Sequence, residues 1–201
     1  MTNEGSCGSK IRLVAMLVLV NGAPGSGKST LARRFAQEHP LTLALDIDIV
    51  RGMLGGSVEQ SQSGALARAL AATMARSHLG AGFDVIVPQF LGRVDFILTL
   101  EELCKDVGAR FTEVALVSSA TDAVERFERR SAESTEPQHV AAAEWQRRSG
   151  GRDELIAMYD RMINVIENRP HTHHIISVEG DIDSAYAHLR SVVEDETDGT
   201  S

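Results

Sequence analysis

Apolar residues gather in five short runs along the chain. The runs lie at 13–20, 41–46, 83–89, 111–118 and 172–178. The first run, Leu-Val-Ala-Met-Leu-Val-Leu-Val, is apolar without a break, as is typical of a strand that is covered on both faces of a parallel sheet. We therefore predict five β-strands at these positions.

Longer segments with helical character separate the predicted strands. They lie at 28–38, 49–55, 62–80, 94–107, 121–134, 137–148, 152–168 and 182–194. Strands that alternate with helices form parallel sheets with right-handed crossovers, and such sheets bind ligands at the carboxyl ends of their strands. We therefore expect an α/β fold of three layers, in which helices flank a five-stranded parallel sheet.

The domain organisation follows from length and local composition. The chain has 201 residues, enough for one α/β domain with a substantial core. Residues 1–10 are rich in glycine, serine and asparagine and predict a disordered tail, whereas 194–201 form an acidic tail. Residues 131–151 are polar and poor in large apolar side chains, which indicates a flap outside the core. One domain is expected to cover 11–193.

The segment after the first predicted strand carries the clearest chemical signal. It reads Gly22-Ala23-Pro24-Gly25-Ser26-Gly27-Lys28-Ser29 and matches the phosphate-binding loop G-x-x-x-x-G-K-[ST]. In such a loop, backbone N–H groups surround the phosphates, the lysine reaches the β- and γ-phosphates, and the hydroxyl group binds Mg²⁺. The following helix, with Thr30 in its first turn, directs its positive end at the same phosphates. The motif predicts ATP and Mg²⁺ as cofactors and does not distinguish ATP from GTP.

Two aspartates follow the second predicted strand, in the sequence Leu45-Asp46-Ile47-Asp48-Ile49-Val50-Arg51. Because Asp46 and Asp48 alternate with apolar residues, we expect both on one face of the strand end, near the phosphates. Phosphoryl transfer needs a carboxylate that accepts the acceptor's proton and a second group that positions Mg²⁺. Arg51 lies one helical turn after Asp48, where it can bind a polar or anionic substrate. The alternative is that Asp48 only caps a helix that begins at Ile49.

The phosphate-binding loop, the Asp48–Arg51 spacing and the arginine-rich segment 123–130 together resemble the small P-loop kinases. The resemblance covers roughly residues 13–190 and is strongest to the polynucleotide kinase and chloramphenicol phosphotransferase group. It implies a P-loop NTPase fold with a helical lid at about 126–151. It also implies that Asp48 is the base, that Arg51 contacts the substrate, and that Asp46 lies near Mg²⁺.

The same resemblance gives roles to two arginines. Arg126 and Arg130 are four residues apart, on one face of a predicted helix. In the family such a pair lies at the entry to the lid, where an arginine stabilises the charge of the transferred phosphoryl group. On a solvated helix the two arginines would instead pair with Glu125 and Glu128.

The third strand and the last one carry weaker signals. Many P-loop proteins have a Walker B aspartate at the end of the third strand, but Pro88-Gln89 stands there, and Asp84 lies at the strand's beginning. Gln89 and Arg93 are therefore expected to face the acceptor. The resemblance also implies that the loop after the last strand packs against the purine, with Gly180 allowing a close approach.

Charge and cysteine content limit the partners and the compartment. The net charge of −8, from 28 acidic and 20 basic residues, disfavours long nucleic acids, which need a basic surface. The apolar run at 13–20 is too short to span a membrane. Two cysteines without metal-ligand spacing predict free thiols in the cytoplasm. The histidines at 171, 173 and 174 are expected at a surface strand start rather than around a metal.

These observations favour an ATP-dependent kinase that phosphorylates a hydroxyl group of a small molecule such as an antibiotic, sugar, nucleoside or polyol. One alternative is a polynucleotide 5′-hydroxyl or nucleotide kinase. Another is a nucleotide-gated regulatory ATPase, which the missing Walker B aspartate would fit. The sequence determines neither the acceptor nor whether the protein is a monomer or a homodimer.

Overall fold

The computed structural model describes residues 14–55, 60–133 and 150–198. The predicted tail at 1–10, the helix predicted at 137–148 and the end of the acidic tail at 199–201 lie outside the described residues. Most of the predicted lid lies outside them as well.

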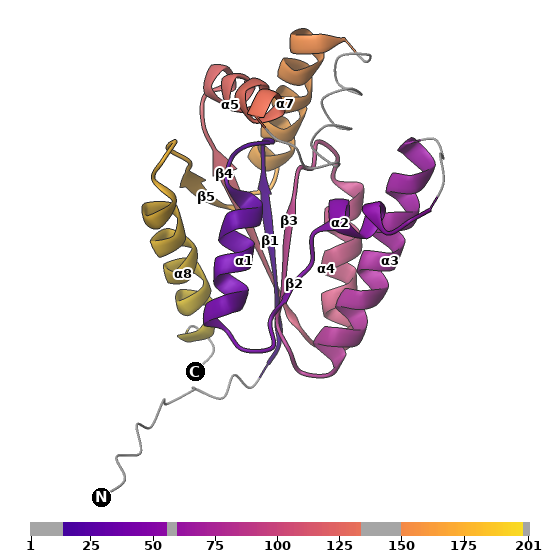
Figure 1. Cartoon of the computed structure of the whole chain (residues 1–201). Helices are drawn as coiled ribbons and strands as arrows, with labels where there is room; N and C mark the ends of the chain where they lie inside the picture. The colour runs from indigo at the N-terminus through magenta and orange to yellow at the C-terminus, as the bar shows by residue number, and fades with distance from the viewer. Residues whose placement is uncertain (1–13, 56–59, 134–149, 199–201) are drawn as a thin grey trace, which may run out of the picture.

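A parallel sheet with the strand order β2-β3-β1-β4-β5 forms the centre of the molecule (Figure 1). Its strands are β1 (Met16–Gly22), β2 (Leu43–Ala44), β3 (Val85–Gln89), β4 (Arg110–Val117) and β5 (His173–Ile176). All neighbouring strands pair in parallel. The predicted α/β fold with a five-stranded parallel sheet is therefore confirmed.

Helices cover both faces of this sheet. They are α1 (Lys28–Glu38), α2 (Ile47–Gly52), α3 (Gln60–Gly80), α4 (Asp95–Val107), α5 (Ala120–Glu133), α7 (Gly151–Glu167) and α8 (Ile182–Asp198). Figure 1 shows α1 and α8 on one side of the sheet and α3 and α4 on the other, with α5 and α7 beyond the carboxyl end of β4. The three layers expected from the alternating pattern are thus present.

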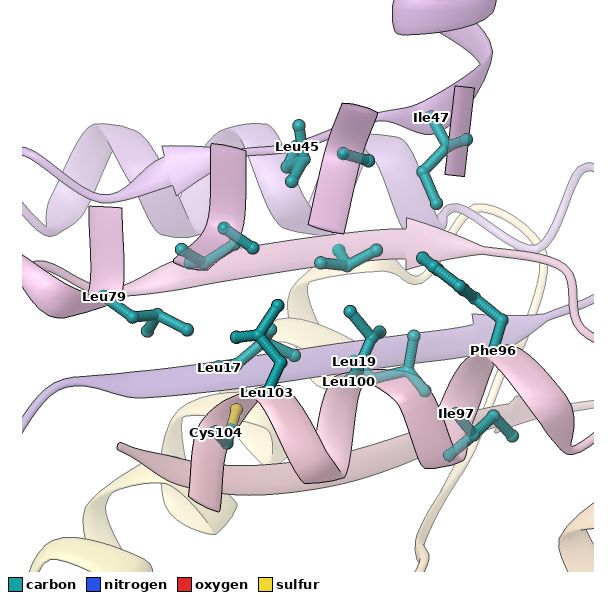
Figure 2. Packing of buried hydrophobic residues seen from close by; sticks show 14 of the residues in the cluster. Leu17, Leu19, Leu45, Ile47, Leu79, Phe96, Ile97, Leu100, Leu103 and Cys104 are labelled. Carbon is teal, nitrogen blue, oxygen red and sulfur yellow. The ribbon is translucent and has the colours of Figure 1, made fainter. Parts of the chain in front are cut away.

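Alternate residues of β1 connect the two cores. Leu17 and Leu19 pack against α3 and α4, and Figure 2 shows this cluster with Phe96, Leu100 and other residues around the two leucines. Met16, Val18 and Val20 belong instead to the cluster formed with α1 and α8. Because β1 is buried on both faces, its end is held firmly, and the phosphate-binding loop begins at that end.

Several helix boundaries differ from the prediction by one to four residues, and two of the differences have a local cause. Helix α2 begins at Ile47, two residues earlier than expected, because Asp46 caps it. Helix α8 continues to Asp198, past the expected end at 194, because no glycine or proline interrupts the sequence before Gly199. Among the described helices, none has the length and apolar character that crossing a bilayer would require.

Candidate active site

The phosphate-binding loop joins β1 to α1 as the motif predicts. The amide of Ser26 donates to the Ala23 carbonyl at 3.1 Å, and Gly25 and Gly27 have φ angles of 86° and 91°. A Cβ atom at Gly22 would lie 2.8 Å from Ser26 Oγ, so that position has no room for a side chain. Ser26 Oγ is buried and has no hydrogen-bond partner within the described residues. The loop therefore offers an unpaired polar group to a ligand.

Lys28 begins α1 and is buried below the loop. Its Nζ donates to the Ala23 carbonyl at 2.8 Å. The pKa of Lys28 is lowered to about 7, chiefly by burial and secondly by the positive charge of Arg130. The carboxylates of Asp48 and Asp46 act in the opposite direction. An anion bound in the loop would favour the protonated lysine again.

Asp46 links the second strand to the loop. Its Oδ2 accepts a hydrogen bond from Ser29 Oγ at 3.0 Å, and its Oδ1 accepts one from the Asp48 amide at 3.0 Å. Asp46 and Asp48 do not alternate along a strand, as the sequence had indicated, because the chain turns into α2 directly after Asp46. The cap of α2 is Asp46, so the alternative in which Asp48 caps a helix from Ile49 is wrong.

The Ser29–Asp46 contact fits a magnesium ion. Mg²⁺ prefers oxygen ligands and usually binds through one or two protein groups together with phosphates and waters. Within the ranges that the structure describes, no three His, Cys, Asp or Glu side chains form a metal-binding group of their own. Asp84 lies at the opposite end of the sheet, where its Oδ1 accepts from the Met16 amide at 2.9 Å. An ion at Ser29 and Asp46 would therefore depend on bound phosphates.

Asp48 and Arg51 form an ion pair on α2, with 3.1 Å between Oδ1 and Nη2. The side chain of Asp48 is half-exposed, and that of Arg51 is 26% exposed. The expected spacing of one helical turn is confirmed. The pair leaves the Asp48 carboxylate accessible near the loop, close enough for its charge to act on Lys28.

The structure separates the two arginines of α5. Arg126 donates from Nη1 to Ser177 Oγ and from Nη2 to the Ser177 carbonyl, both at 2.9 Å, and Ser177 Oγ donates to the Ser26 carbonyl at 3.1 Å. Arg126 thus connects the loop after β5 to the phosphate-binding loop. Arg130 instead lies near Lys28. Glu128 pairs with Arg152 at 2.9 Å.

Two cavities meet beside Arg130. The first, of about 380 Å³, is lined by Gly25, Ser26, Gly27, Arg126, Arg129, Arg130, Ala185 and the segment 177–182 after β5. Gly180 lies in that segment with a φ angle of 77°. The second, of about 250 Å³, is lined by Lys28, Ser29, Thr30, Asp46, Pro88 and Arg130 among others. Of the predicted nucleotide residues, Gly25 to Thr30 and Gly180 line these two adjoining cavities, whereas Gly22, Ala23 and Pro24 line neither.

Of the two acceptor residues predicted at the third strand and its exit, one lines a cavity described here and the other does not. Gln89 is half-buried at the end of β3, opposite Asn21 on β1, and lines none of the cavities described here. Arg93 lines a third cavity of about 710 Å³. The other residues around that cavity are Arg68, Phe90, Leu91, Gly92, Asp95, Phe96, Glu154, Met158 and Arg161.

Two buried polar residues of the site were not predicted from the sequence. Asn21 is fully buried, and its amide group exchanges hydrogen bonds with the backbone of Leu91, at 3.2 Å from Nδ2 and 2.9 Å to Oδ1. Ser177 joins Arg126 to the loop, as described above. A single polar residue at the end of an apolar run was the available signal for Asn21, whereas the contacts of Ser177 join segments far apart in the chain.

Comparisons with known proteins place the fold. A family model described as an AAA domain matches residues 17–155. This chain also resembles a protein chain in the structure of the Pnkp1/Rnl/Hen1 RNA repair complex, with a TM-score of 0.62 and 17% sequence identity. That match covers 79% of this chain but only 47% of the other, so this chain spans about half the length of that relative. A search of curated proteins found no match.

Two further structures match over nearly their full length. A gluconokinase from Sinorhizobium meliloti has a TM-score of 0.58 and 16% identity, with 94% of this chain and 99% of that chain covered. The APS kinase CysC from Mycobacterium tuberculosis, in complex with AMPPNP and APS, has a TM-score of 0.57 and 20% identity, covering 90% and 98%. At these identities the likeness establishes a kinase-like P-loop fold.

Proposed function

The chain belongs to the AAA domain family, whose model matches more than half of it, and we propose that it is an ATP-dependent kinase. The reaction would transfer the γ-phosphoryl group of ATP to a hydroxyl group of a small molecule. One observation carries this proposal: a complete phosphate-binding loop shares a crevice with Asp46 and Arg130, and the charge of Asp48 acts on Lys28 of that loop. Phosphoryl transfer needs these groups and little covalent chemistry from the protein.

On the nucleotide side, each group has a distinct task. The loop amides and Lys28 bind the β- and γ-phosphates, and the first cavity receives the nucleoside, with Gly180 at its wall. Ser29 and Asp46 would hold Mg²⁺, and the ion would neutralise negative charge of the bound phosphates. Arg130 stabilises the charge of the transferred group. Arg126 acts as a positioning residue, because its guanidinium group already donates two hydrogen bonds to Ser177.

On the acceptor side, Asp48 orients the hydroxyl group and accepts its proton. The ion pair with Arg51 fixes the carboxylate while leaving half of it exposed to an incoming molecule. Gln89 and Arg93 are proposed to contact the acceptor from β3 and the loop after it. The net charge of −8 supports a small acceptor over a polynucleotide. The Asp48–Arg51 pair favours an enzyme over a regulatory ATPase, which has no need of an acceptor base.

The test is a search for a phosphorylated product. The purified protein is incubated with ATP, Mg²⁺ and a panel of antibiotics, sugars, nucleosides, polyols and 5′-hydroxyl oligonucleotides, and mass spectrometry detects products heavier by one phosphoryl group. Asp48→Asn should lower transfer by about 10²- to 10⁴-fold, which is the usual contribution of a general base. AMPPNP binding should persist in this variant, because the described hydrogen bond and ion pair of Asp48 are made with Asp46 and Arg51 and not with the loop.

Asp106→Asn is the matched control. Asp106 is an exposed aspartate on α4, paired with Arg76, and its loss should leave transfer unchanged. Full transfer by Asp48→Asn would contradict the role of this residue. Binding of AMPPNP without a product from any acceptor would contradict the kinase assignment and favour the regulatory ATPase.

A further inference from the structure

The third cavity lies outside the nucleotide site and is large enough for a small molecule. It is formed by α3, the loop between β3 and α4, and α7. Its volume of about 710 Å³ is within the range of small-molecule pockets. Phe90, Leu91, Phe96 and Met158 contribute apolar surface to its wall. A molecule with a carbon skeleton can therefore pack there.

The cavity adjoins the site of phosphoryl transfer. Pro88 lines the cavity that contains Lys28 and Ser29, and Phe90, two residues further along, lines the third cavity. Two residues of extended chain span roughly 7 Å. The Asn21 side chain also fixes the third cavity's Leu91 to the end of β1, directly before the phosphate-binding loop. A molecule in the third cavity can thus present a group to the phosphates.

The charged groups around the cavity favour an anion. Arg68, Arg93 and Arg161 all line it, and Arg161 is paired with Glu154 at 2.7 Å. In the described part of the chain, Arg68 and Arg93 have neither an ion pair nor a hydrogen bond from their side chains. Asp95 is the remaining carboxylate among the lining residues. The two guanidinium groups are therefore available to a ligand.

The backbone adds to this preference. Helix α4 begins at Asp95, and its first turn has no side-chain cap. The amide groups of an uncapped first turn carry partial positive charge. Because Phe96 of the same turn lines the cavity, this end of the helix faces the same space as Arg93.

We propose that the third cavity binds the acceptor, and that the acceptor is a hydroxyl compound with an anionic group, a carboxylate or a phosphate ester. This inference rests on the proposed kinase function. Arg68 and Arg93 bind the anionic group, and the apolar wall contacts the carbon skeleton. The hydroxyl group then faces the crevice that contains Lys28. Guanidinium groups suit both anions, because they can form two parallel hydrogen bonds with either.

The test compares hydroxyl compounds in pairs that differ in charge. Suitable pairs are gluconate with gluconamide, glycerate with glyceramide, and a sugar phosphate with its parent sugar. Phosphoryl transfer is followed by mass spectrometry. Binding to the protein saturated with Mg²⁺ and AMPPNP is measured separately by calorimetry. The carboxylate and phosphate arms of the panel identify which anion the cavity takes.

Three variants accompany the wild type in both measurements. Arg68→Gln and Arg93→Gln should each weaken binding of the anionic compound about 10- to 100-fold, the usual effect of losing a charge-assisted hydrogen bond. Arg76→Gln is the control, since Arg76 is on the same helix as Arg68 but is paired with Asp106 at 2.9 Å. This control should behave as the wild type.

The outcomes separate the two proposals. Anionic members that bind at least tenfold better than neutral ones, with a loss in Arg68→Gln and Arg93→Gln, support the cavity's role. Such binding without any phosphorylated product supports the cavity and overturns the kinase function. Transfer to both members of a pair with equal efficiency supports the kinase and overturns the anionic acceptor. If no anionic compound binds, the inference is wrong.

Discussion

Replacing Lys28 with methionine should make the free protein more stable while abolishing nucleotide binding. Lys28 is buried, and its Nζ has one hydrogen-bond acceptor, the Ala23 carbonyl at 2.8 Å. Methionine has a similar length and volume but no charge, so it can occupy the same space without the desolvation cost. The variant therefore separates the stability of the fold from the function of the loop.

The magnitude follows from the pKa of Lys28, which falls from its ordinary value of 10.5 to about 7. Since one pKa unit corresponds to about 1.4 kcal/mol, these surroundings of the charged lysine, burial and neighbouring charges together, cost at most roughly 5 kcal/mol. Loss of the hydrogen bond to Ala23 offsets about 1 kcal/mol of the gain. We therefore expect the methionine variant to be more stable than the wild type by about 2–4 kcal/mol at pH 6.5.

The sign of the pH dependence is fixed by proton linkage. Between pH 7 and 10.5, Lys28 is protonated in the unfolded chain but largely neutral in the folded one. The contribution of Lys28 to the wild-type free energy of unfolding therefore rises with pH, by about 1.4 kcal/mol per pH unit at most. The advantage of the variant should be largest near pH 6.5 and should shrink toward pH 9.

Urea denaturation of both proteins at pH 6.5, 7.5 and 8.5, without nucleotide, measures this difference. Other groups that titrate in this range cancel in the comparison. Lys105→Met, at an exposed position on α4, controls for the loss of one positive charge. A methionine variant at position 28 that is no more stable than the wild type at pH 6.5 would refute the argument. A stability difference that does not change with pH would refute it as well.

Three further predictions concern the same crevice. AMPPNP binding should take up protons above pH 7 and weaken as pH rises, because phosphates restore the charge that burial removes from Lys28; calorimetry in two buffers of different ionisation enthalpy tests this. Asp46→Asn should change the free energy of unfolding by no more than about 0.5 kcal/mol, since asparagine also caps helices. The same variant should weaken Mg²⁺-dependent nucleotide binding about tenfold or more. Unchanged binding in titrations with and without Mg²⁺ would contradict the metal role of Asp46. Asn21→Leu should destabilise the fold by about 2–4 kcal/mol in urea denaturation, because it leaves two buried backbone groups of Leu91 unpaired, and a smaller loss would mean that the loop rearranges.

Local sequence pattern was sufficient for most of the fold. Helix α1 has the predicted bounds, and the strands lie within or one to two residues from their predicted runs. Strand β2 is much shorter than its predicted run at 41–46, because it contains only Leu43 and Ala44. It pairs only with β3, at the edge of the sheet, and an apolar run does not reveal how many of its residues have a partner.

The candidate site was predicted in its members but not in its geometry. Asp46 and Asp48 do lie near the loop, yet the side chain of Asp46 starts a helix two residues earlier than the pattern indicated. Arg126 and Arg130 share a helix face, but Ser177, which lies 51 residues after Arg126, decides that Arg126 is held against the loop. A partner so distant in the chain leaves no local signal. Arg161 and Glu154 of α7 were also missed, because their place beside the third cavity depends on how α7 packs against the loop after β3.

The charges of the crevice connect the nucleotide site with the third cavity. Beside the loop, the carboxylates of Asp46 and Asp48 offset part of the positive charge of Lys28 and Arg130. ATP with one Mg²⁺ is still negative, and an anionic acceptor would add to the repulsion. Cations that lie apart from the phosphates of ATP would lower this repulsion. Arg68 and Arg93 line the third cavity and neither of the two cavities beside the loop, so they can offset the charge of the proposed anionic acceptor without competing for the phosphates of ATP.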